Sequence, residues 1–284
     1  MPLFLSEAYA RIKDVALGQY FPGTSIIHRL DPRIKLVLTI LFIISLFLCE
    51  GIIAYAIMTL FLFVVILITK INISLIFKSL KPILILLIFT AVLNLFYTNK
   101  GETLLSIGFI VITSGGIYTA LYMILRITLL VVGTFVMLTY TTSPIMLTDG
   151  LESLLSPLKL IKFPVHELSM MMSIALRFIP TLVEETDKIM SAQKSRGASF
   201  DSGSILQRAK ALIPILIPLF INAFKRAEDL ALAMECRCYH GGEGRVRMKV
   251  LKVSFIDIVA TILSLLIFCA AIACTYFFDI GVVI

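Results

Sequence analysis

The sequence predicts an all-α membrane protein with about five transmembrane helices and a cytoplasmic domain of long helices. Apolar residues make up 59% of its 284 residues, and only 15% are charged. Soluble domains contain about 45–50% apolar and about 25% charged residues, so this chain has too few polar residues to cover soluble cores. Its apolar residues occur in runs near the length of about 20 that crosses a bilayer. In contrast, 15 of its 25 Lys and Arg residues lie in one segment, 141–252. A soluble enzyme is therefore excluded.

A helix-start signal precedes the first expected span. Asp31 can cap a helix, and Pro32 suits the first helical position. Two further apolar runs follow, separated first by Glu50 and Gly51 and then by an expected basic loop at 70–81. The first three spans are predicted at residues 34–49, 52–69 and 83–97, with a polar turn at 98–101.

The next apolar stretch, 104–140, is too long for one membrane span and somewhat short for two. Ser114-Gly115-Gly116 interrupts it. We therefore expect a short half-span or surface helix at 103–113 and a fourth full span at 117–140. The fifth span is predicted at 255–278, where apolar residues again run for more than 20 positions.

The basic residues predict the orientation of these spans. The segment before residue 36 holds five Lys or Arg residues, the loop 70–81 three and the segment 141–252 fifteen, so 23 of 25 share one side. The positive-inside rule places that side in the cytoplasm. We expect a multi-pass protein of the plasma membrane with a cytoplasmic N-terminus and no nucleic-acid partner. The predicted parts are 1–140 (N-terminal segment and four spans), 141–252 (cytoplasmic domain) and 253–284 (last span).

Two long amphipathic helices are expected in the cytoplasmic domain, at 165–195 and from 205 to about 235. The first would be about 45 Å long, more than a link between two spans requires. The second contains an apolar run at 211–224 that is too short to cross a bilayer, which is typical of an interfacial or partner-covered helix. Methionines 170–172 on the first helix suit contact with changing partners, although ordinary helix packing explains them equally well.

Each of these helices is predicted to end in an arginine. Arginine is favourable at the negative end of the helix dipole, and for either residue alone simple capping is the simpler interpretation. Two such ends in one domain favour a duplicated docking device, because a guanidinium keeps its charge and pairs well with a carboxylate in a partner's groove. The two ends are Ser195-Arg196-Gly197 and Cys236-Arg237-Cys238.

Few other residues suggest chemistry. Arg126 lies inside the fourth predicted span, where a charge costs about 2.5–3.5 kcal/mol on insertion scales. It is a functional candidate, or a structural residue with a buried partner such as a backbone carbonyl or Asp257. The five cysteines do not form a disulfide framework or a zinc set, and no glycine-rich loop ends in Gly-Lys-Ser/Thr. We expect no catalytic residue, no metal and no cofactor in this chain.

Short motifs in fixed order along nearly the whole chain resemble those of one family. The motifs are Pro22-Gly23-Thr24-Ser25, His28-Arg29-Leu30-Asp31-Pro32-Arg33-Ile34-Lys35, Arg177-Phe178-Ile179-Pro180-Thr181-Leu182, Ala192-Gln193-Lys194-Ser195-Arg196-Gly197, Arg226-Ala227-Glu228 and Ala233-Met234-Glu235-Cys236-Arg237. The chain thereby resembles the transmembrane coupling subunits (EcfT, CbiQ-like) of energy-coupling factor transporters, a class of ATP-binding-cassette importers.

The resemblance implies a role in vitamin or metal-ion uptake. The two arginine ends would insert into grooves on two cytoplasmic ATPase subunits, which bind ATP and Mg²⁺ and carry out the hydrolysis. The apolar helix faces would carry a small substrate-binding membrane protein, the S component. Cys236 and Cys238 depart from the family, which more often has small residues there. The residues expected to contact the S component are Met171, Leu212, Leu216 and Phe220.

Two other functions remain open from the sequence. A self-sufficient secondary transporter or channel would need paired ionisable groups or broken helices near the bilayer midplane, in corresponding positions of two halves. Only Arg126 is central in a predicted span, and no repeat of spans is visible. A membrane-tethered scaffold without transport is the other alternative.

Overall fold

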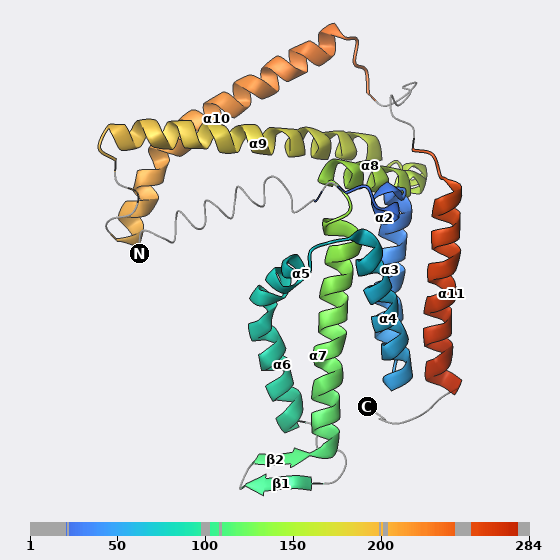
Figure 1. Cartoon of the computed structure of the whole chain (residues 1–284). Helices are drawn as coiled ribbons and strands as arrows, with labels where there is room; N and C mark the ends of the chain where they lie inside the picture. Colours follow the sequence, from blue (N-terminus) through green and yellow to red (C-terminus); the bar gives the residue numbers. More distant parts are fainter. Residues whose placement is uncertain are drawn as a thin grey trace. The chain divides into compact units, whose positions relative to one another are not determined.

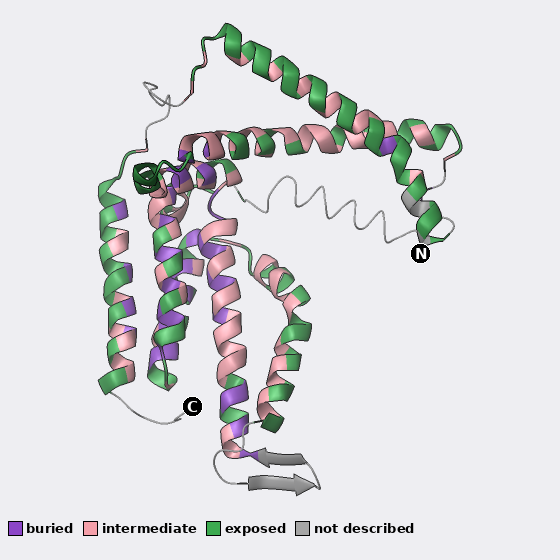
Figure 2. Cartoon of the chain, turned by 180° about the vertical axis from the view of Figure 1, so that it is seen from behind, coloured by how far each residue is buried: buried purple, intermediate pink, exposed green. Residues whose placement is uncertain are grey.

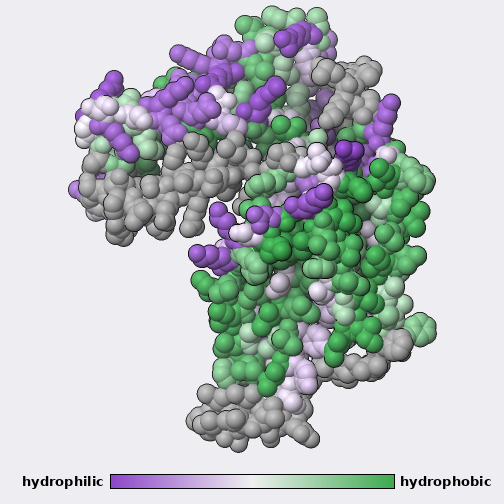
Figure 3. Space-filling view, in the orientation of Figure 1, coloured by the Kyte–Doolittle hydropathy of each residue, from purple (hydrophilic) through white to green (hydrophobic). Residues whose placement is uncertain are grey.

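The computed structural model describes residues 21, 23–97, 103–107, 110–198, 200, 204–241 and 251–277. Pro22, the N-terminal segment 1–20 and the polar turn predicted at 98–101 lie outside this part of the chain. The chain divides into two compact units. Residues 144–250 belong to one, here called the long-helix unit, and residues 20–143 and 251–284 form the other, the membrane unit (Figure 1). Hydrophobic residues dominate the visible surface of the membrane unit, whereas hydrophilic residues gather on the long-helix unit (Figure 3).

The membrane unit contains the expected spans as helices. Its elements are α2 (Ile26–Arg29), α3 (Pro32–Leu48), α4 (Ile52–Thr69), α5 (Ile73–Leu80), the 3₁₀ turn η1 (Lys81–Ile83), α6 (Leu84–Tyr97), β1 (Thr103–Ile107), β2 (Ile110–Thr113), α7 (Ser114–Thr134), the π-helical η2 (Phe135–Thr139) and α11 (Phe255–Phe277). Within the described part of the chain, four helical segments are long and apolar enough to cross a membrane: Ile52–Thr69, Ile73–Tyr97, Ser114–Thr139 and Phe255–Phe277. The 17 residues of α3 rise about 26 Å, close to the hydrocarbon thickness of about 30 Å.

Two predictions for the connections between spans are wrong. The segment 103–113 is neither a half-span nor a surface helix, because β1 and β2 pair as an antiparallel hairpin. Its Ile and Val residues at 110–112 favour strands. The interruption at 114–116 is instead the first turn of α7, where the Thr113 side chain accepts a hydrogen bond from the Gly116 N–H at 3.1 Å.

The second wrong prediction is the loop at 70–81, which contains helix α5. This helix begins where the Asn72 side chain accepts a hydrogen bond from the Ser74 N–H at 3.1 Å.

Aromatic rings form the centre of the membrane unit. Phe42 of α3, Phe61 of α4 and Phe268 of α11 have ring centroids 5.1–6.1 Å apart. Helix α7 approaches this cluster at Gly133, where a Cβ would overlap the Phe42 ring. Burial therefore concentrates on α3, α4 and α7 (Figure 2), while α6 has no buried residue.

A buried lysine joins the start of α3 to the end of the α7–η2 helix. Lys35 is 3% exposed, and its Nζ donates to the Thr141 carbonyl at 3.0 Å, the Thr142 hydroxyl at 3.1 Å and the His28 carbonyl at 3.3 Å. A buried charge is tolerated only with such partners. These bonds hold the first turn of α3 in place.

The long-helix unit consists of α8 (Pro144–Leu154), the 3₁₀ helix η3 (Ser156–Ile161), α9 (Val165–Ser195) and α10 (Ile205–Cys236). Both long helices lie where the apolar periodicity predicts them. Helix α10 begins with a capping box between Ser204 and Gln207. The start of α9 is fixed to α8 through Glu152, whose carboxylate contacts the His166 imidazole at 3.2 Å and accepts from the Ser169 hydroxyl at 2.9 Å.

Candidate docking site on the long helices

The end of α9 is a Schellman motif around Arg196. Arg196 is the C-cap, and Gly197 follows with φ +85°. The N–H of Ala198 donates to the Gln193 carbonyl and that of Gly197 to the Lys194 carbonyl, both at 3.0 Å. Glycine suits this position because the left-handed conformation carries no Cβ penalty. The motif stops the helix at the arginine.

The end of α10 has the same motif around Arg237. The N–H of Tyr239 donates to the Met234 carbonyl at 3.0 Å, and that of Cys238 donates to the Glu235 carbonyl at 2.8 Å. Cys238 takes the place of the glycine, with φ +54°. This conformation costs a residue with a Cβ about 1–2 kcal/mol. The backbone geometry of the two ends is therefore shared even though their sequences differ.

The two arginines leave the backbone in matching conformations. Arg196 has φ −86° and ψ 6°, and Arg237 has φ −94° and ψ 17°. Both are exposed, as are Ser195, Gly197, Cys236 and Cys238 beside them. Within the described part of the chain, neither guanidinium has a hydrogen-bond or ion-pair partner. Capping here is done by the backbone, so both guanidinium groups can bind another molecule.

A polar cluster fixes α9 to α10 where the two helices are in contact. Glu185 of α9 lies 2.8 Å from the Arg226 guanidinium of α10, and its other carboxylate oxygen accepts from the Asn222 amide. The side chain of Glu185 is 14% exposed and that of Arg226 is 36% exposed. We call these three residues the cross-brace. It joins α9 to α10 through one ion pair and one hydrogen bond.

Exposed apolar side chains cover one region of α10. Met171 on α9 and Leu212, Leu216 and Phe220 on α10 are 42–61% exposed. On α10 they belong to a larger set at helical spacing, which we call the α10 apolar stripe. Its members are Leu212, Ile213, Leu216, Ile217, Phe220, Ile221 and Phe224. Contiguous apolar surface of this kind marks a partner or membrane contact.

Arg126 has a buried partner, as the structural interpretation expected, but that partner is the Tyr55 side chain and not Asp257. Its Nε donates to the Tyr55 hydroxyl at 2.5 Å, and its guanidinium carbon lies 5.8 Å from the Tyr55 ring centroid and 6.0 Å from that of Phe47. Asp257 instead accepts hydrogen bonds from backbone N–H groups. The Tyr55 hydroxyl and the two aromatic rings thus stabilise this cation within the membrane unit.

The sequence did not identify the cross-brace. Arg226 stands in a quoted motif, but Glu185 is one of several acidic residues on the polar side of α9. The sequence signal for this contact is that a charged residue, Arg226, follows the apolar run at 211–224. No group of three or more His, Cys, Asp or Glu residues in the described ranges is arranged to hold a metal.

The chain is similar to known proteins over most of its length. The profile of the family described as cobalt transport protein (CbiQ) matches residues 23–250. Three similar proteins are called energy-coupling factor transporter transmembrane protein EcfT. That of Clostridium kluyveri is 50% identical over 262 residues, 92% of this chain and 97% of that protein. The protein of Ruminiclostridium cellulolyticum is 52% identical over 88% of this chain and 93% of that protein. The protein of Bacillus subtilis is 50% identical over 82% of this chain and 88% of that protein.

Proposed function

Since the chain belongs to the CbiQ family and groups with its EcfT-type transmembrane proteins, we propose that it is the coupling subunit of an energy-coupling factor importer. In this role it transmits ATP-driven motion from two cytoplasmic ATPases to a separate substrate-binding membrane protein, for uptake of a vitamin or metal ion. The observation that carries the proposal is the shared Schellman geometry, which presents Arg196 and Arg237 in equivalent positions on two helices.

The arginine ends suit a groove with an acidic residue. A guanidinium offers five donors in a rigid fork and cannot be deprotonated at physiological pH. Ser195 and Gly197 are small, so the end of α9 can enter a narrow groove. Cys236 and Cys238 are larger, and the groove that receives α10 would be wider. Two ends of the same geometry match two related ATPase subunits, which bind the ATP and Mg²⁺.

The cross-brace would allow α9 and α10 to move together when the ATPases close. Because Glu185 binds both Asn222 and Arg226, a displacement of one helix end is opposed at the point where α9 and α10 touch. Closure of two ATPases would then move both helices together. The α10 apolar stripe and Met171 would contact the substrate-binding protein, whose position would follow the helices.

Charge reversal of both arginines tests the proposal. Truncating one partner of a desolvated charge pair costs about 2–5 kcal/mol, and each 1.4 kcal/mol is tenfold in affinity. The double variant Arg196→Glu, Arg237→Glu should therefore weaken ATPase co-purification by roughly 30-fold or more and abolish uptake, while the protein still inserts. The double variant Lys188→Glu, Lys225→Glu is the matched control, because both lysines are exposed on the same helices.

The control variant should assemble with the ATPases and transport normally. If the arginines only terminate their helices, the Arg variants should lose about 0.3–1 kcal/mol of helix stability and assemble as well as the control. Normal ATP-driven uptake by the Arg196→Glu, Arg237→Glu protein would refute the coupling role.

A further inference from the structure

The membrane unit contains an apolar groove between α4 and α11. Its cavity volume is about 550 Å³, and its lining is almost entirely apolar. Leu60 of α4 and Phe255 and Leu263 of α11 line it and are 58–78% exposed, so the groove opens along its side. Along α11 it extends from Phe255 to Ile267, about 18 Å at 1.5 Å per residue. That length is slightly more than one leaflet, which is about 15 Å in a hydrocarbon core about 30 Å thick.

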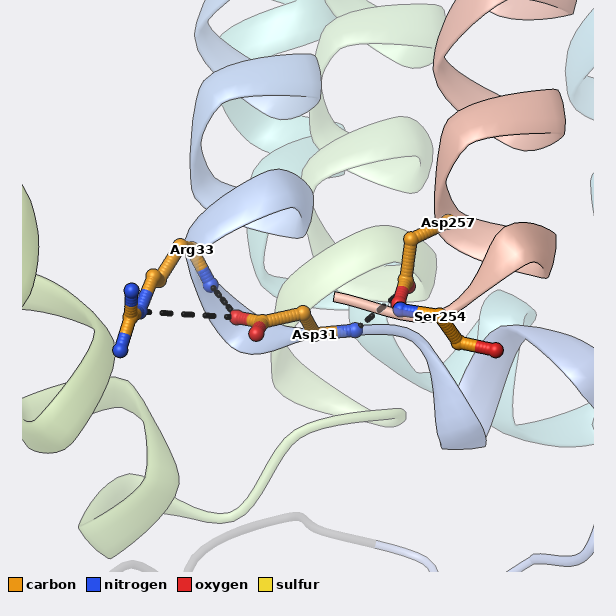
Figure 4. Close-up of polar contacts among 4 residues, drawn as sticks. All are labelled: Asp31, Arg33, Ser254 and Asp257. Carbon is orange, nitrogen blue, oxygen red and sulfur yellow. Dashed lines mark hydrogen bonds and ion pairs between the residues drawn. The ribbon is translucent and has the colours of Figure 1, made fainter. Parts of the chain in front are cut away.

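One end of the groove is held together by the Asp257 carboxylate. It accepts hydrogen bonds from the Asp31 N–H at 2.8 Å and from the Ser254 N–H at 2.7 Å (Figure 4). The start of α3 and the start of α11 therefore lie side by side. Arg29 lies two residues before Asp31 in the sequence, and Lys252 lies two residues before Ser254. The chemistry of this end is consequently set by two chain segments that are far apart in the sequence.

Among the described residues near this end, the exposed charged side chains are basic. Arg29 and Lys252 are exposed, and within the described ranges neither has an ion-pair or hydrogen-bond partner. The carboxylates of Asp31 and Asp257 are buried and accept backbone N–H bonds. The Arg33 guanidinium lies 3.9 Å from Asp31 and compensates part of its charge.

We propose that this groove binds an anionic phospholipid, with one acyl chain along α11 and the phosphate between Arg29 and Lys252. The apolar lining excludes a polar ligand from the groove itself, and the two cations select an anionic headgroup over a zwitterionic one. Lys35 also lines the groove, but its amine is saturated by three oxygen partners and does not compete for the phosphate. A bound lipid would fix α11 against α4 in the membrane.

The absence of tryptophan from the chain permits a direct test. Leu263→Trp places one fluorophore in the groove, and the full chain is reconstituted in mixed phosphatidylcholine and phosphatidylglycerol vesicles in which one lipid or the other carries brominated acyl chains. Each basic residue near a membrane surface contributes an attraction worth about fivefold in binding. Brominated phosphatidylglycerol should therefore quench Leu263→Trp at least fivefold more, per mole, than brominated phosphatidylcholine.

Ile262→Trp is the control, because Ile262 is 59% exposed at the same depth of α11 and does not line the groove. The two brominated lipids should quench it equally. The substitutions Arg29→Gln and Lys252→Gln together should bring the ratio at Leu263→Trp close to one. Phe255→Trp, an aromatic replacement at the mouth of the groove, gives the same measurement if Leu263→Trp does not fold.

Two results would overturn the proposal. Equal quenching of Leu263→Trp by both lipids would make the groove an ordinary lipid contact without headgroup selection. Protection of Leu263→Trp from both lipids, with Ile262→Trp still quenched, would show that protein fills the groove. Neither result depends on ATPase docking, since the measurement needs only the membrane unit within the full chain.

Discussion

Removing the Glu185 carboxylate should loosen the junction of α9 and α10. Glu185 is 14% exposed and Arg226 36%, so this ion pair lies between exposed pairs, worth about 0–1 kcal/mol, and buried pairs, which cost about 3–5 kcal/mol to break. Water rehydrates the released guanidinium in part. We therefore expect Glu185→Ala to destabilise the junction by about 1–2 kcal/mol, which multiplies the population of alternative arrangements by roughly 5–30.

The distance between the two helix ends reports this change. Spin labels on Ala192→Cys and Ala233→Cys, in a background without the native cysteines, lie one turn before each arginine, and both alanines are exposed. Pulsed electron paramagnetic resonance should give one narrow distance distribution for the reference protein. With Glu185→Ala the distribution should broaden or gain a second maximum.

Glu184→Ala is the matched control, since Glu184 is the exposed neighbour of Glu185 and has no partner in the described ranges. A double-mutant cycle of Glu185→Ala with Arg226→Ala should give an interaction free energy of about 1 kcal/mol. In the assembled transporter, Glu185→Ala should retain the ATPases and lose uptake. An unchanged distance distribution for Glu185→Ala, or the same change with Glu184→Ala, would refute the cross-brace.

Two further predictions concern the helix ends and the membrane unit. Cys238→Gly should stabilise the end of α10 by about 1 kcal/mol, because it removes a Cβ from a left-handed conformation, and Gly197→Ala should destabilise the end of α9 by a similar amount. Hydrogen exchange of the amides in the last turn should therefore become slower in the first variant and faster in the second. Tyr55→Phe should lower the unfolding free energy in detergent by about 1–2 kcal/mol, more than Arg126→Leu, because it leaves the cation without its acceptor. Tyr122→Phe is the control, since that buried hydroxyl has no hydrogen-bond partner among the described residues; a larger loss for Tyr122→Phe would contradict this explanation.

The prediction of the α9 and α10 boundaries succeeded because helix ends depend on neighbouring residues. Ser204 and Gln207 form a capping box within one turn, and Gly197 allows the left-handed end of α9. The expected spans are helical for a related reason, since backbone groups in hydrocarbon must pair within their own segment. The hairpin at 103–113 was missed because hydrophobic length alone does not distinguish strands from a short helix.

The sequence by itself determined the membrane class, the long helices, the positions of the two arginines and the family resemblance. All of these follow from composition, local periodicity and short motifs. Only the tertiary structure decided that Tyr55 is the partner of Arg126, that Glu185 binds Arg226, and that Asp257 joins α3 to α11. The physical reason is that a charge can be satisfied by many acceptors along a chain, and packing alone brings one of them within hydrogen-bond distance.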